Sequence, residues 1–352
     1  MANAPQATDQ RCREKILSLA NDRRNRGQMI GLGRMLKPKS EADRENAECC
    51  EFRCNFHSNA VCLTTDDNSI TRQHRVLRMT LRVLLNEYMT KTQKELAFLR
   101  DLSIGSDWTR RFTELVDKNF DFADNENLLY INAGTGEHAF ALRDRLDEKI
   151  GIFATCEDED TLRIARDKAA ALRSDVDFSM IRFEDDSFDA VIADASLVRS
   201  NDYEMSVDEA VRVAKSGANV GVYSVTAGSY GEIFSLLWEV LFNEDLGEHG
   251  HAVEEMITEQ PTVSKVEQIA KHAGLVNIKT HSANEVFEYD NGAAFVSSPL
   301  VADFLMPVWL RALNEDQQEH VKQKLSELID SEDSSLTFRF SVKATLMIGE
   351  KA

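Results

Sequence analysis

One short segment, with an apolar run followed by two closely spaced glycines, constrains the fold of this chain more than any other. It spans residues 128–142 and reads LLYINAGTGEHAFAL. The apolar run predicts a buried strand, the glycines predict a tight turn, and the residues after them have helical spacing. Backbone N–H groups at the start of such a helix can bind polar or anionic atoms. The segment therefore predicts a strand, turn and helix that together bind a nucleotide-type ligand.

A second apolar run and an acidic cluster follow at the distance expected for a ribose-binding group. Residues 150–155 predict the next strand, and residues 157–160 read EDED. A carboxylate about twenty residues beyond a glycine turn typically accepts hydrogen bonds from ribose hydroxyls. The pattern Gly134-x-Gly136-x-x-Ala139 also satisfies the dinucleotide fingerprint. This motif alone therefore leaves both an NAD site and an S-adenosylmethionine site open.

Two further motifs follow the glycine turn in a characteristic order. After NAGTG at residues 132–136 come IRFEDDSFDAV at residues 181–191 and AKSGA at residues 214–218. In this order the motifs resemble those of the class I S-adenosylmethionine-dependent methyltransferases, particularly the type 11 group, which has a GCGTG-like loop, an LPF-x-D-x-SFD-x-V segment and an LKPGG-like turn. The resemblance covers residues 121–229 together with the last predicted strand of the chain.

The resemblance implies an α/β fold with a Rossmann-like seven-stranded sheet and an antiparallel closing strand. Apolar and polar residues alternate over residues 336–346, as expected for that strand, which NAD-binding domains usually lack. The implied activity is transfer of the methyl group of S-adenosylmethionine to a small-molecule or protein acceptor. The implied cofactor-binding residues are Asn132, Ala133, Gly134, Thr135, Gly136, Glu157, Asp194 and Ala195.

Several positions depart from the family pattern. Tyr130 replaces the usual acidic residue at the end of the first strand, and Asn132 replaces the first glycine of the loop. Cys156 stands where the ribose carboxylate usually lies, so we expect Glu157 to take that role. Residues 176–183 are too short for the turn that recognises adenine. These departures leave a non-catalytic methyltransferase-like scaffold as an alternative, with an NAD-binding oxidoreductase as a weaker one.

No catalytic residue can be assigned from the sequence, because methyl transfer mainly requires alignment of donor and acceptor and exclusion of water. His138, next to the glycine loop, is the nearest candidate for a general base. A histidine at a helix start more often caps backbone amides or faces solvent, and we prefer that interpretation.

The periodicity and composition of the chain predict three regions. Residues 1–69 are a basic, partly flexible segment, with nine Lys or Arg and three Asp or Glu in the first 40 positions. Residues 70–120 have leucines at helical spacing, including Leu96, Leu99 and Leu102, which predicts helices with a packed face. The resemblance implies that these helices form a lid over the cofactor site. Residues 121–352 form the methyltransferase-like domain, with a helical insertion at about 282–335.

Two clusters contain possible metal ligands. Cys49, Cys50, Cys54, His57 and Cys62 lie within fourteen residues, but their spacing is too compressed for paired zinc knuckles. His249 and His251 lie in the acidic segment 243–260. We favour reduced thiols for the first cluster and a solvated loop for the second, and predict no metal.

Charge and hydropathy exclude several classes of function. The formal net charge of −19 argues against a general nucleic-acid surface. No apolar run reaches the roughly 20 residues that a bilayer requires, and no leader-like apolar run is seen near residue 1. Six cysteines without such a leader indicate a reducing compartment. The expected location is the cytoplasm, and the oligomeric state remains open.

Overall fold

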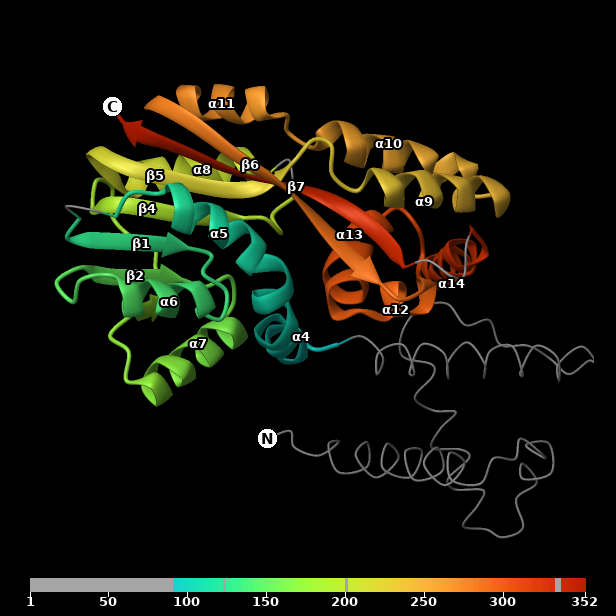
Figure 1. Cartoon of the computed structure of the whole chain (residues 1–352), viewed down its shortest axis with the longest axis horizontal. Helices are drawn as coiled ribbons and strands as arrows, with labels where there is room; N and C mark the ends of the chain where they lie inside the picture. Colours follow the sequence, from blue (N-terminus) through green and yellow to red (C-terminus); the bar gives the residue numbers. More distant parts are fainter. Residues whose placement is uncertain (1–90, 123–124, 200–201, 333–336) are drawn as a thin grey trace, which may run out of the picture. The chain divides into compact units, whose positions relative to one another are not determined.

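The structure is a computed structural model that describes residues 91–122, 125–199, 202–332 and 337–352 (Figure 1). The chain divides into two compact units, Met1–Val83 and Leu84–Ala352, and only the second contains described residues. The cysteine cluster and the rest of residues 1–90 lie outside them, so the predictions made for that region stay predictions.

A seven-stranded sheet forms the centre of the described unit (Figure 1). Its order is β3-β2-β1-β4-β5-β7-β6, and β7 is antiparallel to both of its neighbours. The strands are β1 (Asn127–Ile131), β2 (Gly151–Thr155), β3 (Asp177–Ser179), β4 (Phe188–Ala195), β5 (Ala214–Thr226), β6 (Leu275–Tyr289) and β7 (Phe338–Lys351). The expected α/β sheet with an antiparallel closing strand is confirmed.

Alternation along the strands divides the core into two layers. In β1, Leu128 and Tyr130 join one hydrophobic cluster, whereas Leu129 and Ile131 join the other. The helices that follow the sheet strands are α6 (Glu137–Arg145), α7 (Glu159–Leu172), α8 (Tyr203–Val213) and α11 (Val263–His272). Residues of α8 and α11 cover the second cluster, and residues of α6 and α7 cover the first. Because strands β1 to β5 run parallel to one another, their carboxyl ends meet at one edge of the sheet.

A helical segment precedes the sheet and consists of α4 (Gln93–Leu99), the π-helix η2 (Arg100–Thr109) and α5 (Arg110–Asn119). The wider turn of the π-helix rotates the side chains that follow it, so the buried face runs through Ile104, Trp108 and Phe112. The predicted stripe through Leu102 is wrong at that residue, which is 59% exposed. The sequence periodicity assumed a regular α-helix.

The acidic segment at residues 243–260 is helical and is not the solvated loop expected from its charge. It contains the 3-10 helix η4 (Gly247–His249) and α10 (Gly250–Glu259), preceded by α9 (Gly231–Asn243). Val253 and Met256 are buried. Gly250 lies against the Trp238 ring so closely that a Cβ atom there would collide with it. The two helices can therefore pack closely in spite of the high charge.

The last two strands form a long antiparallel ribbon that runs past the rest of the sheet toward α9 (Figure 1). Because β6 continues to Tyr289, it passes the expected start of the insertion at residue 282. Phe287 and Phe340 stack across the ribbon, with ring centroids 4.9 Å apart. The remaining elements between β6 and β7 are α12 (Gly292–Ser297), the π-helix η5 (Leu300–Leu305), α13 (Met306–Trp309) and α14 (Glu315–Glu332).

Segment 214–218 is also not the simple turn that the resemblance suggests. Ala214 pairs with Phe188, and the pairing then resumes with Asn219 against Ala190. The intervening residues form a bulge within β5, where Gly217 has a φ of 80°. The motif thus marks an irregularity inside a strand.

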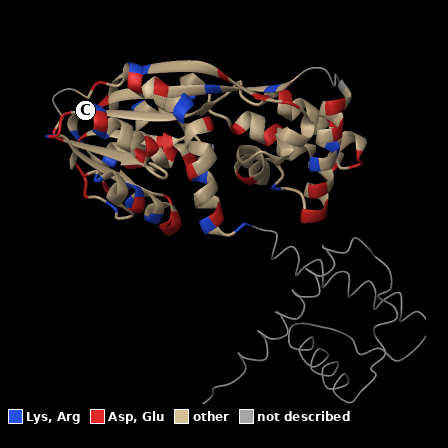
Figure 2. Ribbon diagram, turned by 60° about the horizontal axis from the view of Figure 1, so that its bottom comes forward, with Lys and Arg blue, Asp and Glu red and all other residues tan. Residues whose placement is uncertain are grey.

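Charges of both signs are interspersed over the described helices (Figure 2). No helix among the described residues is long and apolar enough to cross a bilayer. Within the same residues, no group of three or more His, Cys, Asp or Glu side chains is arranged to hold a metal ion.

Candidate cofactor site

The glycine loop connects β1 to α6 and is held between the ends of β2 and β4. The Asn132 side-chain amide donates to the Asp194 carbonyl oxygen at 3.2 Å, and the Ala133 N–H donates to the Thr155 carbonyl oxygen at 2.8 Å. Asn132 adopts the left-handed conformation with a φ of 56°, which asparagine tolerates better than most residues. The replacement of the family's first glycine by Asn132 therefore preserves the shape of the loop.

The two glycines of the loop have different neighbours. A Cβ atom on Gly136 would lie 2.5 Å from the Phe178 ring, so this glycine is required for packing inside the domain. A Cβ atom on Gly134 would instead lie 3.2 Å from the Arg100 side chain. Gly134 therefore leaves room beside the loop, and Arg100 fills that room.

Arg100 also forms an ion pair with Glu157, the carboxylate expected to bind ribose. The Arg100 Nη2 and Glu157 Oε1 atoms are 2.6 Å apart, and the two side chains are 17% and 25% exposed. Burial raises the pKa of the Glu157 carboxyl, and the Arg100 charge opposes this rise. The Arg100 guanidinium thus occupies one of the two acceptor oxygens of the Glu157 carboxylate.

Cys156, the other candidate for the ribose position, is part of the hydrophobic core. It is 6% exposed, and burial raises the pKa of its thiol to about 12. A neutral thiol is a weak hydrogen-bond acceptor. The structure therefore favours Glu157 over Cys156 as the polar group at the end of β2.

A cavity of about 20 Å³ lies between the glycine loop and η2. It has room for about one water molecule. Four of the predicted site residues line it, namely Ala133, Gly134, Thr135 and Asp194. The others are Asn132 and Gly136, which support the loop, Glu157, which pairs with Arg100, and Ala195, which lines a second cavity.

A chain of buried polar side chains runs beneath the loop. The Tyr130 and Tyr223 hydroxyls are 2.7 Å apart, and the His138 Nδ1 atom lies 3.0 Å from the Tyr130 hydroxyl. The His138 Nε2 atom lies 3.0 Å from Asp117 Oδ1. Both ring nitrogens of His138 therefore have partners, and the residue neither caps backbone amides nor faces solvent. The residue also lines the cavity at the glycine loop, and its role as a general base stays a hypothesis.

Asp194 continues this polar layer toward the second cavity. Its carboxylate accepts hydrogen bonds from the Ser196 N–H at 2.8 Å and from the Ser196 hydroxyl at 2.7 Å. The Trp108 indole N–H donates to the Ser196 hydroxyl oxygen at 2.9 Å. Burial raises the pKa of Asp194, whereas the Ser196 hydroxyl and the Arg100 charge oppose the rise. Asp194 and Ser196, at the end of β4 and just after it, thus link the glycine loop to η2 through hydrogen bonds to Asn132 and Trp108.

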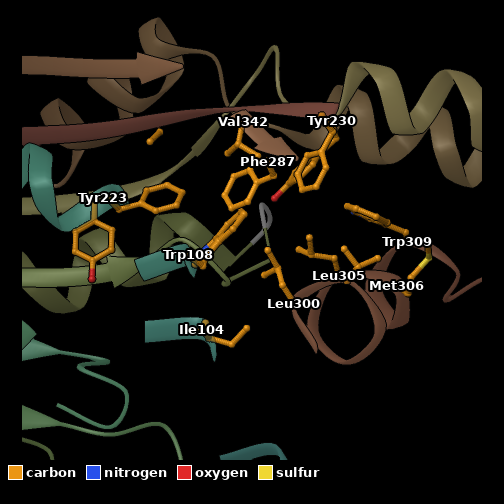
Figure 3. Packing of buried hydrophobic residues seen from close by; sticks show 14 of the residues in the cluster. Ile104, Trp108, Tyr223, Tyr230, Phe287, Leu300, Leu305, Met306, Trp309 and Val342 are labelled. Carbon is orange, nitrogen blue, oxygen red and sulfur yellow. The ribbon is translucent and has the colours of Figure 1, made fainter. Parts of the chain in front are cut away.

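Figure 3 shows the hydrophobic packing around this connection, with Trp108 between Ile104 and Phe287. The rings of Trp108 and Phe287 are 5.4 Å apart. This packing fixes η2 against the long ribbon. Arg100 is therefore presented to the glycine loop by a helix that is anchored through its two buried residues, Ile104 and Trp108.

Comparisons with known proteins agree with the expected family. Residues 129–221 match the family model described as a methyltransferase domain. No curated protein matches the chain. Among solved structures, the YcgJ protein from Bacillus subtilis is 16% identical, with 69% of this chain and 98% of that chain covered and a TM-score of 0.45.

Two further solved structures have stated ligands. Phosphoethanolamine N-methyltransferase 2 from Haemonchus contortus, in complex with phosphomonomethylethanolamine and S-adenosylhomocysteine, is 13% identical, with coverages of 75% and 59% and a TM-score of 0.44. Geranyl diphosphate C-methyltransferase from Streptomyces coelicolor is 13% identical, with coverages of 69% and 79% and a TM-score of 0.38. Residues 129–221 of this chain therefore match a methyltransferase domain, and the order of the sheet is that of the class I methyltransferase fold.

Proposed function

We propose that the chain binds S-adenosylmethionine at the glycine loop and transfers its methyl group to a small-molecule or protein acceptor. The observation that carries this proposal is the convergence of the left-handed loop at Gly134 with the Glu157 carboxylate at the end of the neighbouring strand. S-adenosylmethionine supplies a methyl group activated by its sulfonium. In this assignment Glu157 accepts hydrogen bonds from the ribose hydroxyls, because a carboxylate accepts charge-assisted hydrogen bonds well.

Binding of the donor requires an opening step, because the cavity of about 20 Å³ is too small for a nucleoside. Arg100 must leave both Glu157 and the space beside Gly134. The ten-residue π-helix that carries it is a type of element that often occurs at functional sites. We therefore propose that η2 is the cover of the donor site, in agreement with the lid expected from the sequence.

The neighbouring residues limit how η2 can move. Asp101 pairs with Lys168 at 2.6 Å. The Trp108 side chain is fully buried, and its indole N–H donates a hydrogen bond to the Ser196 hydroxyl. Side-chain rotation of Arg100 is the first step that these contacts permit. In the closed site these contacts leave room for about one water molecule, and exclusion of bulk water helps a group-transfer reaction.

The ion pair between Arg100 and Glu157 also supports a second candidate function. A methyltransferase-like scaffold that never binds a donor would need a group to neutralise the half-buried Glu157, and Arg100 provides it. The two candidates differ in a measurable way, because only the enzyme exchanges Arg100 for a ligand.

Replacing Arg100 with leucine is expected to tighten S-adenosylmethionine binding about fivefold to thirtyfold. The wild-type chain must break the ion pair, at a cost of about 1–2 kcal/mol, because the pair is more buried than most surface pairs. Isothermal calorimetry on the wild type and the variant measures the difference. Arg111→Leu is the matched control, since Arg111 pairs with Glu285 at 3.1 Å and does not line the cavity at the loop.

Weaker binding in the Arg100→Leu variant would mean that Arg100 contacts the donor directly. An equal change in the Arg111→Leu control would mean that the effect comes from loss of helix stability. Absence of binding in both the wild type and Arg100→Leu would favour the scaffold.

A further inference from the structure

Two buried hydroxyls near the carboxyl ends of β4 and β5 lack hydrogen-bond partners among the described residues. They belong to Tyr203, the first residue of α8, and to Ser224 in β5. Each residue is 2% exposed. Ser224 lies near enough to Tyr203 to offset part of the rise that burial causes in the pKa of that phenol, but no hydrogen bond of ordinary geometry joins them. Buried hydroxyls are normally satisfied, so this pair indicates a missing partner.

Tyr203 and Ser224 both line a cavity of about 100 Å³ that is separate from the cavity at the glycine loop. Ala195 and Ser196 also line it, whereas Asp194 lines the cavity at the loop. The turn after β4 therefore lies between the two cavities. A ligand in the larger cavity would lie next to the proposed donor site.

Another part of the cavity lining is aromatic and apolar. The rings of Tyr230 and Trp309 meet edge to face with centroids 5.3 Å apart, and Phe234 meets Trp309 in the same way at 6.0 Å. Leu305 completes this wall, and Figure 3 shows it beside Tyr230 and Trp309. These rings support one another, so the wall exists before a ligand enters. Such a wall favours an apolar ligand body.

The charged residues of the cavity are already paired. Arg311 pairs with Glu259 at 3.4 Å, and Arg199 pairs with Asp202 at 3.6 Å. The Arg199 side chain is 70% exposed and the Arg311 side chain is 37% exposed, so both cations are at the mouth. The deep polar groups are the neutral hydroxyls of Tyr203 and Ser224. A charged ligand group would find no unpaired counterion among the described lining residues, so a neutral group fits best.

We propose that this cavity binds a neutral, compact, apolar group that carries one hydroxyl, such as a phenol, with that hydroxyl bound between Tyr203 and Ser224. The proposal deepens the proposed function, and rests on it, in identifying this group as the methyl acceptor. A protein cavity that takes up benzene has a volume of roughly 150 Å³. At about 100 Å³ the present cavity is smaller than that, so a single small ring would fill it and the rest of a larger molecule would project through the mouth.

The test is a ligand-observed NMR titration of the full chain with phenol, toluene and benzoate at neutral pH, without S-adenosylmethionine. Toluene has the size of phenol without its hydroxyl, and benzoate is an anion. Phenol is expected to bind about fivefold to tenfold more tightly than toluene, the difference typical of a hydrogen bond to a neutral group, and benzoate is expected not to bind. Tyr203→Phe and Ser224→Ala should each remove most of the preference for phenol.

A measurement of thermal stability separates a binding role from a structural one. Tyr203→Phe removes a hydroxyl without a partner, so the melting temperature should stay constant or rise. Tyr223→Phe is the matched control. It removes a hydroxyl that is bonded to Tyr130, and should lower the melting temperature by about 2–6 °C.

Equal affinities for phenol and toluene, or an unchanged phenol preference in both variants, would overturn the proposal and mean that water satisfies the two hydroxyls. A fall in melting temperature for Tyr203→Phe with no effect on phenol binding would overturn it in the same way. Calorimetry with S-adenosylmethionine is independent of these results. Phenol binding without donor binding would contradict the proposed function but would keep the cavity as a ligand site. Donor binding without phenol binding would support the proposed function and overturn the proposal for the cavity.

Discussion

Replacing Gly136 with alanine is expected to lower the free energy of unfolding by about 3 kcal/mol. The residue has a φ of 87°, which costs an L-amino acid roughly 1–2 kcal/mol. The added methyl group would also lie 2.5 Å from the Phe178 ring and 2.9 Å from the Phe140 ring, and overpacking of this kind costs about 1–3 kcal/mol. Urea unfolding followed by circular dichroism measures the change.

Gly217→Ala is the matched control for this prediction. Gly217 has a similar φ of 80°, but a Cβ atom there would meet nothing within 4 Å. Only the backbone cost remains, so the loss should be about 1 kcal/mol. Equal losses in the two variants would mean that Phe178 and Phe140 move aside without cost, and that Gly136 is present for the ligand alone.

Replacing Glu157 with alanine is expected to weaken S-adenosylmethionine binding about tenfold to a hundredfold. Hydrogen bonds to a charged group contribute about 1.5–3 kcal/mol. In the sequence, Glu157 is the carboxylate next to Cys156, which stands at the ribose-binding position of the family. The comparison is made in the Arg100→Leu background, because no ion pair then has to be broken. Calorimetric titration of the two proteins gives the ratio.

Cys156→Ala in the same background is the control for the Glu157 prediction. The Cys156 thiol is buried in the core and neutral, so its loss should affect stability more than donor affinity. A larger loss of affinity in Cys156→Ala than in Glu157→Ala would show that the ribose site is one residue earlier than we propose.

The glycine loop, its flanking strand and helix, and the position of Glu157 could be predicted because each depends on neighbours in the sequence or on the ends of adjacent parallel strands. The ion pair of Arg100 with Glu157 could not be predicted, since the two residues are 57 positions apart in the sequence. The pairing of Tyr130 with Tyr223 across 93 positions was equally hidden. Both contacts depend on how side chains pack between elements, and no local periodicity encodes them.

Two errors in the predicted elements have the same origin. Residue charge suggested a loop where α10 is a helix, because the pairing of Gly250 with Trp238 is a tertiary contact. The predicted leucine stripe failed at Leu102 because η2 departs from 3.6 residues per turn. The sequence likewise did not indicate a role for the hydroxyls of Tyr203 and Ser224, since only the structure shows that they are buried without hydrogen-bond partners among the described residues.

The central claim is that the glycine loop binds S-adenosylmethionine once Arg100 moves. Isothermal calorimetry of the full chain with S-adenosylmethionine, S-adenosylhomocysteine and NAD tests it most directly. We expect the first two ligands to bind with dissociation constants in the micromolar range, more tightly in Arg100→Leu, and NAD to show no measurable heat. Saturable binding of NAD in place of S-adenosylmethionine, or no binding of any of the three by the wild type and Arg100→Leu, would contradict the claim.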